Sequence, residues 1–203
     1  MAVEEARSEH LQLRGTLRIT TTVEFALAQV VPALTVFREQ HPQLHVHLST
    51  SSTHADLISE RFDLAIRLGR MLDSNLRAVQ LSTFDVFAVA APALIERFAP
   101  ASTLAALEQW PTLGHGRVPE LTVTDPEGVE HLYPPGPWTT AIVADNSVTL
   151  RAFALAGQGV AVLPDWLVQE DLLAGRLVCL LGDHSFARQG VYVLFPDTRQ
   201  LTV

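Results

Sequence analysis

From Gly15 onward, the chain switches repeatedly between two kinds of segment. In one kind apolar and polar residues alternate, and in the other apolar residues recur every three or four positions. Alternation is typical of β-strands, and the longer spacing is typical of amphipathic helices. Strands that alternate with helices predict an α/β fold with a mainly parallel sheet and helices on its faces. In the first half of the chain we expect strands at 16–21, 44–50 and 63–69, a helix from 23 to about 41, and a shorter helix from about 53.

The second half continues the pattern with shorter elements. The turn-forming residues Asp125, Pro126 and Gly128 predict a hairpin. Pro32, in the long first helix, should bend that helix or leave a carbonyl unpaired, because proline lacks a backbone N–H. The remaining expected elements are strands at 79–91 (two, with a turn at 84–85), 121–124, 129–132, 141–144, 160–163, 177–181 and 191–195 and helices at 92–98, 103–107, 146–156 and 165–173.

Composition narrows the classes of function. The chain has 22 acidic and 14 basic side chains and a net charge of −8, which argues against a nucleic-acid surface because positive charge drives phosphate binding. The single Cys179 excludes a disulfide framework within the chain, and we expect it to be a small core residue. The first ten residues lack the features of a secretory signal, and no apolar run reaches the roughly 20 residues of a membrane span. We therefore expect a cytoplasmic protein with no membrane contact.

Polar residues gather at three predicted junctions between a strand and a helix: 20–22, 49–53 and 146–147. In open α/β sheets, ligands bind at the carboxyl ends of the strands, where free N–H groups and helix dipoles favour anions. The junctions therefore predict a site for an anionic or strongly polar small molecule. The alternative for any single hydroxyl is that it only caps a helix.

Arg67 lies at the end of a predicted strand with apolar neighbours. Its guanidinium suits a carboxylate of a ligand. The alternative is a surface salt bridge to Asp63 or Glu60, and the sequence does not separate the two readings. Together, one arginine and several hydroxyls indicate a small acid or a polar aromatic ligand.

Other motifs lead to no cofactor or metal. Gly157-Gln-Gly159 follows a predicted helix and precedes a strand, the reverse of a dinucleotide-binding turn, so we interpret it as a helix-to-strand turn. His45 and His47 share one strand face without a carboxylate or cysteine at useful spacing, and we expect them to face solvent. His115, in Gly114-His-Gly116, could lie near a cleft, but no nucleophile elbow or phosphate-binding loop accompanies it. We expect no cofactor, no metal and no catalytic residue.

An ordered set of motifs, of which 56–69 is the strongest, resembles the effector-binding domain of LysR-type transcriptional regulators. The resemblance covers nearly the whole chain from Gly15 and rests on the segments 15–19, 32–37, 41–42, 56–69, 91–92, 156–164 and 175–178. It implies a periplasmic-binding-protein-like α/β fold, in which two Rossmann-like lobes are joined by two crossing strands and hold a ligand in the cleft between them. The implied organisation is a remnant of a linker at 1–14, lobe I at 15–88 and 188–203, and lobe II at 89–187.

The same resemblance implies which residues contact the ligand and how the domain works. The family's winged helix-turn-helix has no counterpart in this sequence, so DNA would be contacted only through a DNA-binding domain outside this chain. The partners implied are a small-molecule effector and a homodimer or higher homo-oligomer. With His115 added from its position, the candidate ligand-binding residues are Thr21, Thr22, Ser51, Ser52, Arg67, Gly69, His115, Asn146 and Ser147.

We therefore expect a regulatory domain that senses an effector and signals by a change in the relation of its lobes. A solute-binding protein for uptake is one alternative, since it has the same lobes but requires export. The other alternative is a small α/β enzyme that uses His115 with Asp145, which substrate turnover would distinguish from reversible binding.

Overall fold

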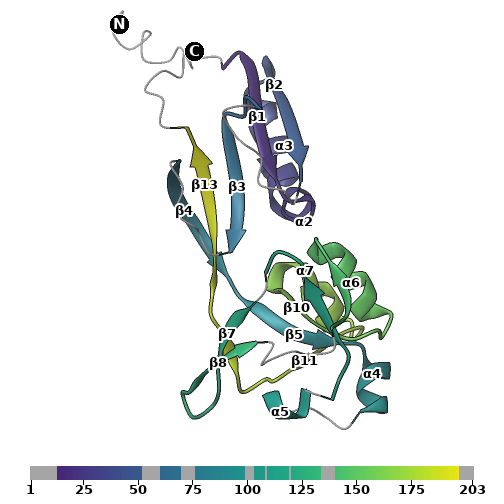
Figure 1. Ribbon diagram of the computed structural model, residues 1–203. Coiled ribbons are helices and arrows are strands. Elements are labelled where there is room, and N and C mark those ends of the chain that lie inside the picture. The colour runs from purple at the N-terminus through teal and green to yellow at the C-terminus, as the bar shows by residue number, and fades with distance from the viewer. Residues whose placement is uncertain are drawn as a thin grey trace, which may run out of the picture. The chain divides into compact units, whose positions relative to one another are not determined.

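The structure is a computed structural model that describes residues 13–51, 60–69, 76–98, 103–107, 109–118, 120–133 and 140–196 (Figure 1). The chain divides into two compact units. Unit 1 comprises Met1–Arg67, Leu72–Gln80 and Tyr192–Val203, and unit 2 comprises Leu68–Met71 and Leu81–Val191. The division of the lobes that the sequence predicts, at 88/89 and 187/188, remains a prediction.

The first sheet has five strands in the order β2-β1-β3-β13-β4. Strands β1 and β2 run parallel in register from Gly15↔Leu44 to Thr21↔Thr50, and β3 runs parallel on the other side of β1. The parallel pairing confirms the predicted crossovers, because parallel neighbours need a connection that returns along the sheet. The strands are β1 (Gly15–Thr21), β2 (Leu44–Thr50), β3 (Leu64–Gly69), β4 (Arg77–Phe84) and β13 (Gln189–Phe195).

The connection from β1 to β2 is helical throughout but changes its winding. It consists of α2 (Val23–Phe25), a π-helical turn η1 (Ala26–Val30) and α3 (Val31–Gln40). The N–H of Val31 bonds to the carbonyl of Ala26, five residues back, directly before Pro32. Because Pro32 has no N–H to offer, the widened turn accommodates the missing hydrogen bond. The sequence predicted a bend or an unpaired carbonyl at this point, and the structure has a π turn directly before Pro32.

The second sheet also has five strands, in the order β11-β5-β10-β6-β9. Strands β6, β10 and β9 run parallel, whereas β5 is antiparallel to both β10 and β11. Helix α6 packs on β6, β9 and β10, and α7 packs on β10. The bounds are β5 (Val86–Ala90), β6 (Thr112–His115), β9 (Thr140–Ala144), β10 (Val160–Pro164), β11 (Val178–Leu180), α4 (Pro92–Arg97), α5 (Leu104–Leu107), α6 (Ser147–Leu155) and α7 (Asp165–Leu173).

A small third sheet confirms the predicted hairpin. Its strands, in the order β12-β7-β8, are β7 (Leu121–Thr124), β8 (Glu130–Tyr133) and β12 (Ser185–Phe186), and both pairs are antiparallel. Tyr133 of β8 and Phe186 of β12 meet edge to face with ring centroids 5.5 Å apart. This contact covers the core of unit 2 from the hairpin side.

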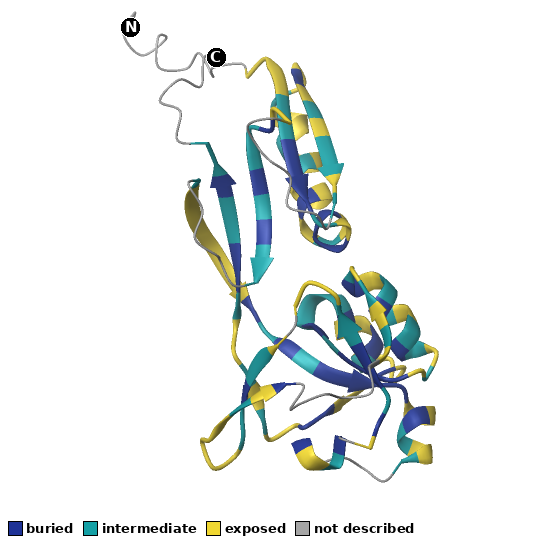
Figure 2. Cartoon of the chain, viewed as in Figure 1, coloured by how far each residue is buried: buried dark blue, intermediate teal, exposed yellow. Residues whose placement is uncertain are grey.

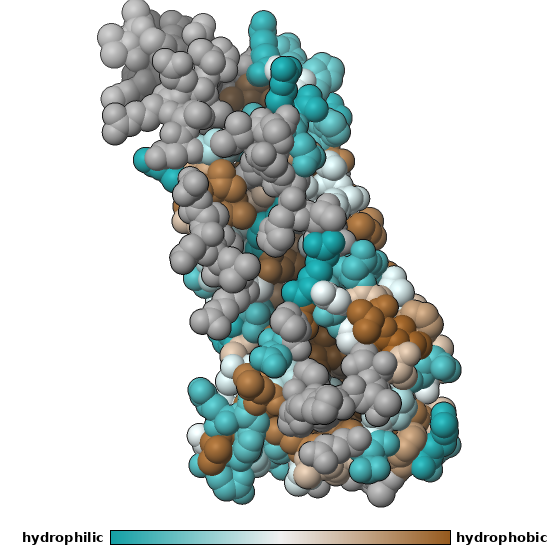
Figure 3. Space-filling view, in the orientation of Figure 1, coloured by the Kyte–Doolittle hydropathy of each residue, from teal (hydrophilic) through white to brown (hydrophobic). Residues whose placement is uncertain are grey.

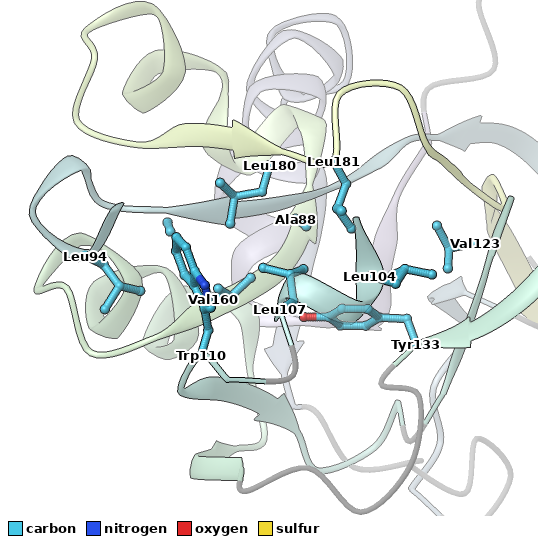
Figure 4. Close-up of a cluster of buried hydrophobic side chains, with 11 residues drawn as sticks. Ala88, Leu94, Leu104, Leu107, Trp110, Val123, Tyr133, Val160, Leu180 and Leu181 are labelled. Carbon is cyan, nitrogen blue, oxygen red and sulfur yellow. The ribbon is translucent and has the colours of Figure 1, made fainter. Parts of the chain in front are cut away.

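Unit 2 has its core on both faces of the second sheet. Most of β5 is buried, as its dark blue colour in Figure 2 shows. On one face, Leu94, Leu107 and Trp110 pack with Val160 and Tyr133, as Figure 4 shows. The other face carries a second cluster of residues from β10, α6 and α7: Ala154, Ala161, Leu163 and Val168 with Leu113, Leu150, Leu177 and Val89. Burial on both faces explains why the central strand, β10, is apolar at every position and does not alternate between apolar and polar residues.

The structure corrects one expectation about the core. Cys179 is exposed, although the apolar run around it predicts a buried residue. It lies on β11, the edge strand of the second sheet, where Val178 and Cys179 face solvent and only Leu180 is buried. An edge strand has a neighbour on one side only, so its apolar residues need not be covered.

Candidate functional site

The carboxyl ends of β1, β2 and β3 bring together the candidate residues of unit 1. Thr21 is the last residue of β1, and the N–H of Ser51, directly after β2, donates a 2.9 Å hydrogen bond to the Thr21 carbonyl oxygen. The register Thr20↔Ala65 places β3 on the opposite side of β1. Thr21, Thr22, Ser51 and Arg67 therefore share one end of one sheet, as their positions at strand ends predicted. Ser52 lies outside the described residues.

Thr22 has a visible structural role. Its Oγ1 accepts a hydrogen bond from the N–H of Phe25 over 3.4 Å, which makes Thr22 the N-cap of α2. The Thr22 hydroxyl therefore caps a helix, which was the alternative to a role in ligand binding. The cap also fixes the direction in which the chain leaves β1.

Arg67 is the most informative residue of this group. It is 8% exposed, and its Nη1 donates to the carbonyl oxygen of the neighbouring Ile66 over 3.3 Å. Its Nη2 is buried and has no hydrogen-bond partner within the described parts of the chain. Burial lowers the pKa of the Arg67 guanidinium, and the charge of Glu60 opposes that shift. An arginine stays protonated even so, and the structure therefore holds a buried cation with an unused donor.

The surface salt bridge considered for Arg67 does not form among the described residues. The Asp63 carboxylate instead accepts a 2.7 Å hydrogen bond from the N–H of Arg18, and this bond ties the start of β3 to β1. Glu60 acts on Arg67 only through its charge. Because Asp63 bonds to Arg18 instead, the structure favours a ligand over a surface salt bridge as the partner of Arg67.

Beside the predicted Thr21, this end of the sheet holds two buried polar residues that were not among the candidates, Thr20 and Glu24. Thr20 and Thr21 are 0% exposed and Glu24 is 6% exposed. The Oγ1 atoms of both threonines and Oε2 of Glu24 are buried without a hydrogen-bond partner in the described structure. One signal was available in the sequence: Glu24 is a lone acid in the otherwise apolar run Val23-Glu-Phe-Ala-Leu27.

Gly69 closes β3 in a conformation that other residues avoid. Its φ is +95°, in the region that favours glycine because there is no Cβ to clash. A Cβ at this position would lie 3.8 Å from Oε1 of Gln189, so steric room is not what requires glycine here. Its role is to turn the backbone at the end of the strand that carries Arg67.

The second group of candidate residues lies at the carboxyl ends of β6 and β9 in unit 2. His115 ends β6 and is paired in register with Ala144 at the end of β9. Asn146 and Ser147 follow β9 directly and begin α6. The structure therefore brings His115, Asn146 and Ser147 to one end of the second sheet. Strand β6 itself was not predicted, because Thr112-Leu-Gly-His115 is too short and too mixed to show a period.

Two of these three residues already have partners. Oδ1 of Asn146 accepts from the N–H of Thr149 over 2.8 Å as the N-cap of α6, and its Nδ2 donates to Oδ1 of Asp145 over 3.2 Å. Nδ1 of His115 accepts from the N–H of Arg117 over 3.2 Å. This contact fixes the imidazole as the acceptor at Nδ1, so its proton is at Nε2 when the ring is neutral. Ser147 is 9% exposed at the first position of α6.

The two groups consist mainly of hydroxyl and other hydrogen-bonding side chains, and one of them includes the buried Arg67. In the described parts of the chain, no three histidine, cysteine, aspartate or glutamate side chains are placed to hold one metal ion. A hydroxyl-rich end of a parallel sheet with a buried guanidinium suits a carboxylate or a similar anion. Across the described residues, no helix is both long and apolar enough to cross a bilayer.

Comparison with known proteins gives a consistent picture. The profile of the family described as LysR substrate binding domain matches residues 10–203. The HTH-type transcriptional regulator PtxR of Pseudomonas aeruginosa is 29% identical over 215 residues, which cover 100% of this chain and 64% of PtxR. The chain thus spans somewhat less than two thirds of the length of this relative.

Solved structures agree in the fold. The structure of CrgA, a LysR-type transcriptional regulator from Neisseria meningitidis, has a TM-score of 0.79 at 26% identity and covers 97% of this chain and 66% of its own. The Vibrio cholerae virulence activator AphB has a TM-score of 0.78 at 23% identity, with 96% and 66% covered. The likeness to AphB concerns the fold alone. These similarities confirm the predicted periplasmic-binding-protein-like α/β class.

Proposed function

This chain belongs to the LysR substrate binding domain family, and we propose that it is the effector-sensing domain of a LysR-type transcriptional regulator. In this proposal it binds a small anionic or strongly polar metabolite and performs no catalysis. The description of PtxR as an HTH-type transcriptional regulator supports the regulatory context. DNA contact then belongs to a helix-turn-helix region, which agrees with the net charge of −8 of this chain.

The observation that carries the proposal is the buried Arg67. A charged group that loses its water without gaining a partner destabilises the fold by several kcal/mol in rough terms. The unpartnered Nη2 of Arg67 is therefore best explained as one side of an interaction that a ligand completes. Guanidinium groups bind carboxylates through two parallel hydrogen bonds, so the ligand that fits is an acid.

The other candidate residues extend this ligand site. We assign Thr21, Ser51 and Ser52 to lobe I, with Thr22 and Gly69 shaping its loops. Lobe II contributes His115, Asn146 and Ser147. The lobes proposed are 15–88 with 188–203, and 89–187. A ligand held by both would change their relation, and a homodimer or higher homo-oligomer would pass that change to the DNA-binding regions.

A thermal-shift screen of small metabolic acids and their neutral analogues tests this function. A ligand that binds only the folded state raises its stability by about 2.7 kcal/mol when present at a hundredfold excess over its dissociation constant. We expect acids to stabilise the protein and to be recovered intact by mass spectrometry. A ligand that is consumed would identify an enzyme instead, and stabilisation by neutral analogues alone would contradict the role of Arg67.

Light scattering tests the proposed assembly separately. We expect a particle of at least twice the 22.2 kDa chain mass at micromolar concentration. A monomer under these conditions would contradict signalling through a homo-oligomer but would leave ligand binding by a single chain in place.

A further inference from the structure

Glu24 is the second buried charge at the ligand-binding end of unit 1. It is 6% exposed, and Oε2 has no hydrogen-bond partner in the described structure. A carboxylate in the first turn of a helix gains a little from the helix dipole, by less than the loss of water at a buried oxygen. As with Arg67, the missing partner needs an explanation.

The register of the sheet places Glu24 and Arg67 close to each other without pairing them. Thr20 is aligned with Ala65, so Arg67, two residues further along β3, is level with Thr22, the residue directly after β1. Glu24 follows Thr22 by two residues, so the Cα atoms of Glu24 and Arg67 are separated by on the order of 10 Å. Within the described residues no ion pair joins the two side chains, and only Glu60 acts on the charge of Arg67.

Thr20, next to the end of β1, supplies a further polar group on the face of the sheet that carries Arg67. Thr20 shares a sheet face with Arg67, because side chains alternate along both strands from the aligned pair Thr20↔Ala65. Thr21 faces the other way. Both side chains are 0% exposed and both Oγ1 atoms lack partners among the described residues. Among the described residues, Arg67, Glu24 and Thr20 thus each have an unpartnered polar atom at this end of the first sheet. The face of the molecule drawn in Figure 3 shows hydrophilic and hydrophobic residues intermixed.

We infer that the ligand of this site is dipolar, with an anionic group for Arg67 and a cationic ammonium group for Glu24, as in an amino acid. This inference rests on the proposed function, since it concerns the same site, and it adds both a recognition residue and a ligand class. A dipolar ligand satisfies both buried charges at once. A simple acid satisfies only Arg67 and brings a second negative charge toward the Glu24 carboxylate.

Isothermal titration of the protein with matched ligands tests the inference without any variant. The probes are the standard α-amino acids and straight-chain ω-amino acids, their N-acetyl derivatives, and the carboxylates of the same length without nitrogen. Acetylation removes the positive charge and keeps the acid. We expect at least one amino acid to bind roughly ten- to hundredfold more tightly than its N-acetyl derivative and than the carboxylate of the same length without nitrogen. This difference is in line with a hydrogen bond between charged groups.

Variants then locate the recognition of the amine. Glu24→Gln keeps the size of the side chain but removes its charge, and it should abolish the preference for the amino acid while binding of the plain carboxylate is retained. Glu39→Gln, at an exposed glutamate of α3, is the matched control and should change neither affinity. Circular dichroism and the midpoint of thermal unfolding show whether the Glu24 variant folds, and the matched-ligand series on the wild-type protein stands if it does not.

The possible outcomes distinguish a failure of this inference from a failure of the proposed function. Equal affinity for amino acids and plain carboxylates would overturn the dipolar ligand and leave the acid-sensing function in place. A preference for amino acids that survives in Glu24→Gln would overturn the role of Glu24. No binding by any amino acid would also overturn the inference, whereas loss of acid binding of every kind would remove the proposed function as well.

Discussion

The backbone N–H of Ser51 donates a hydrogen bond to the carbonyl oxygen of Thr21 over 2.9 Å, directly beyond the last aligned pair of β1 and β2. This bond extends the parallel ladder into the loop and holds two candidate loops at a fixed separation. Ser51→Pro removes the donor, and we expect it to lower the free energy of unfolding by about 1–3 kcal/mol and to weaken ligand binding. Urea denaturation measures the first effect and titration the second.

Ser51→Ala is the control for this substitution, because alanine keeps the N–H. We expect it to destabilise the protein clearly less than Ser51→Pro does. Equal losses in the two variants would show that the side chain of Ser51, and not its backbone, supports the loop.

We expect Arg67 to stabilise the complex with the ligand but not the ligand-free protein. Arg67→Met keeps the length of the side chain and removes the buried charge, so we expect the ligand-free variant to gain about 1–3 kcal/mol in unfolding free energy. Affinity for acidic ligands should fall at the same time. Arg38→Met, at an exposed position of α3, should change stability by less than about 1 kcal/mol and leave affinity unchanged.

Chemical denaturation and titration of both variants decide between two roles for this guanidinium. A loss of stability in Arg67→Met would mean that the fold itself satisfies the charge. Unchanged affinity would remove Arg67 from the ligand site.

Most of the fold could be predicted from periodicity because the elements concerned are regular and one-sided. The β2 pattern Leu44-His-Val-His-Leu48 alternates in the sequence, and His45 and His47 are exposed as predicted. Helix α7 has the predicted bounds, since Pro164 precedes it and Gly175 with φ +65° follows it. Because proline and glycine often stand at the ends of helices and strands, these ends can be predicted from the sequence.

Features that depend on neighbours far along the chain could not be predicted. Strand β6 exists because β10 and β9 pair with its two sides, and nothing in its own four residues indicates this. The exposure of Cys179 depends on the edge position of β11. In the candidate site, strand ends indicated Thr21 and Arg67, whereas the burial of Glu24 appears only when its surroundings are folded.

The turn Gly157-Gln-Gly159 between α6 and β10 provides a prediction about packing. A Cβ on the buried Gly159 would lie 2.8 Å from the carbonyl oxygen of Pro111 and 3.0 Å from Cγ of Leu113. Because backbone cannot yield easily, we expect Gly159→Ala to lower the unfolding free energy by about 1–3 kcal/mol. Gly182→Ala, where a Cβ meets nothing within 4 Å, is the control and should be nearly neutral in the same denaturation experiment.

The Asp171 carboxylate joins two helical segments of unit 2. Its side chain is 0% exposed and accepts from Nε of Arg151 on α6 and, over 2.8 Å, from Nε of Arg176 beyond the end of α7. Its backbone carbonyl also accepts from the N–H groups of Arg176 and Leu177. Both guanidinium groups are partly exposed, so water can solvate them if the carboxylate is lost. We therefore expect Asp171→Asn to cost about 2–3 kcal/mol, below the range for breaking a fully buried pair.

The pH dependence of that loss identifies its cause. Burial raises the pKa of the Asp171 carboxyl, but the hydrogen bonds and charges of Arg151 and Arg176 outweigh burial and hold the pKa below its ordinary value of 3.8. The native state therefore binds this proton less readily than the unfolded chain, and the stabilisation is complete above the ordinary pKa and disappears as the pH falls through the lowered one. The difference in unfolding free energy between wild type and Asp171→Asn should be constant from neutral pH down to about pH 5 and then shrink toward acid. Urea denaturation at a series of pH values measures it, and a difference that stays constant into strong acid would show that the asparagine variant loses packing rather than charge.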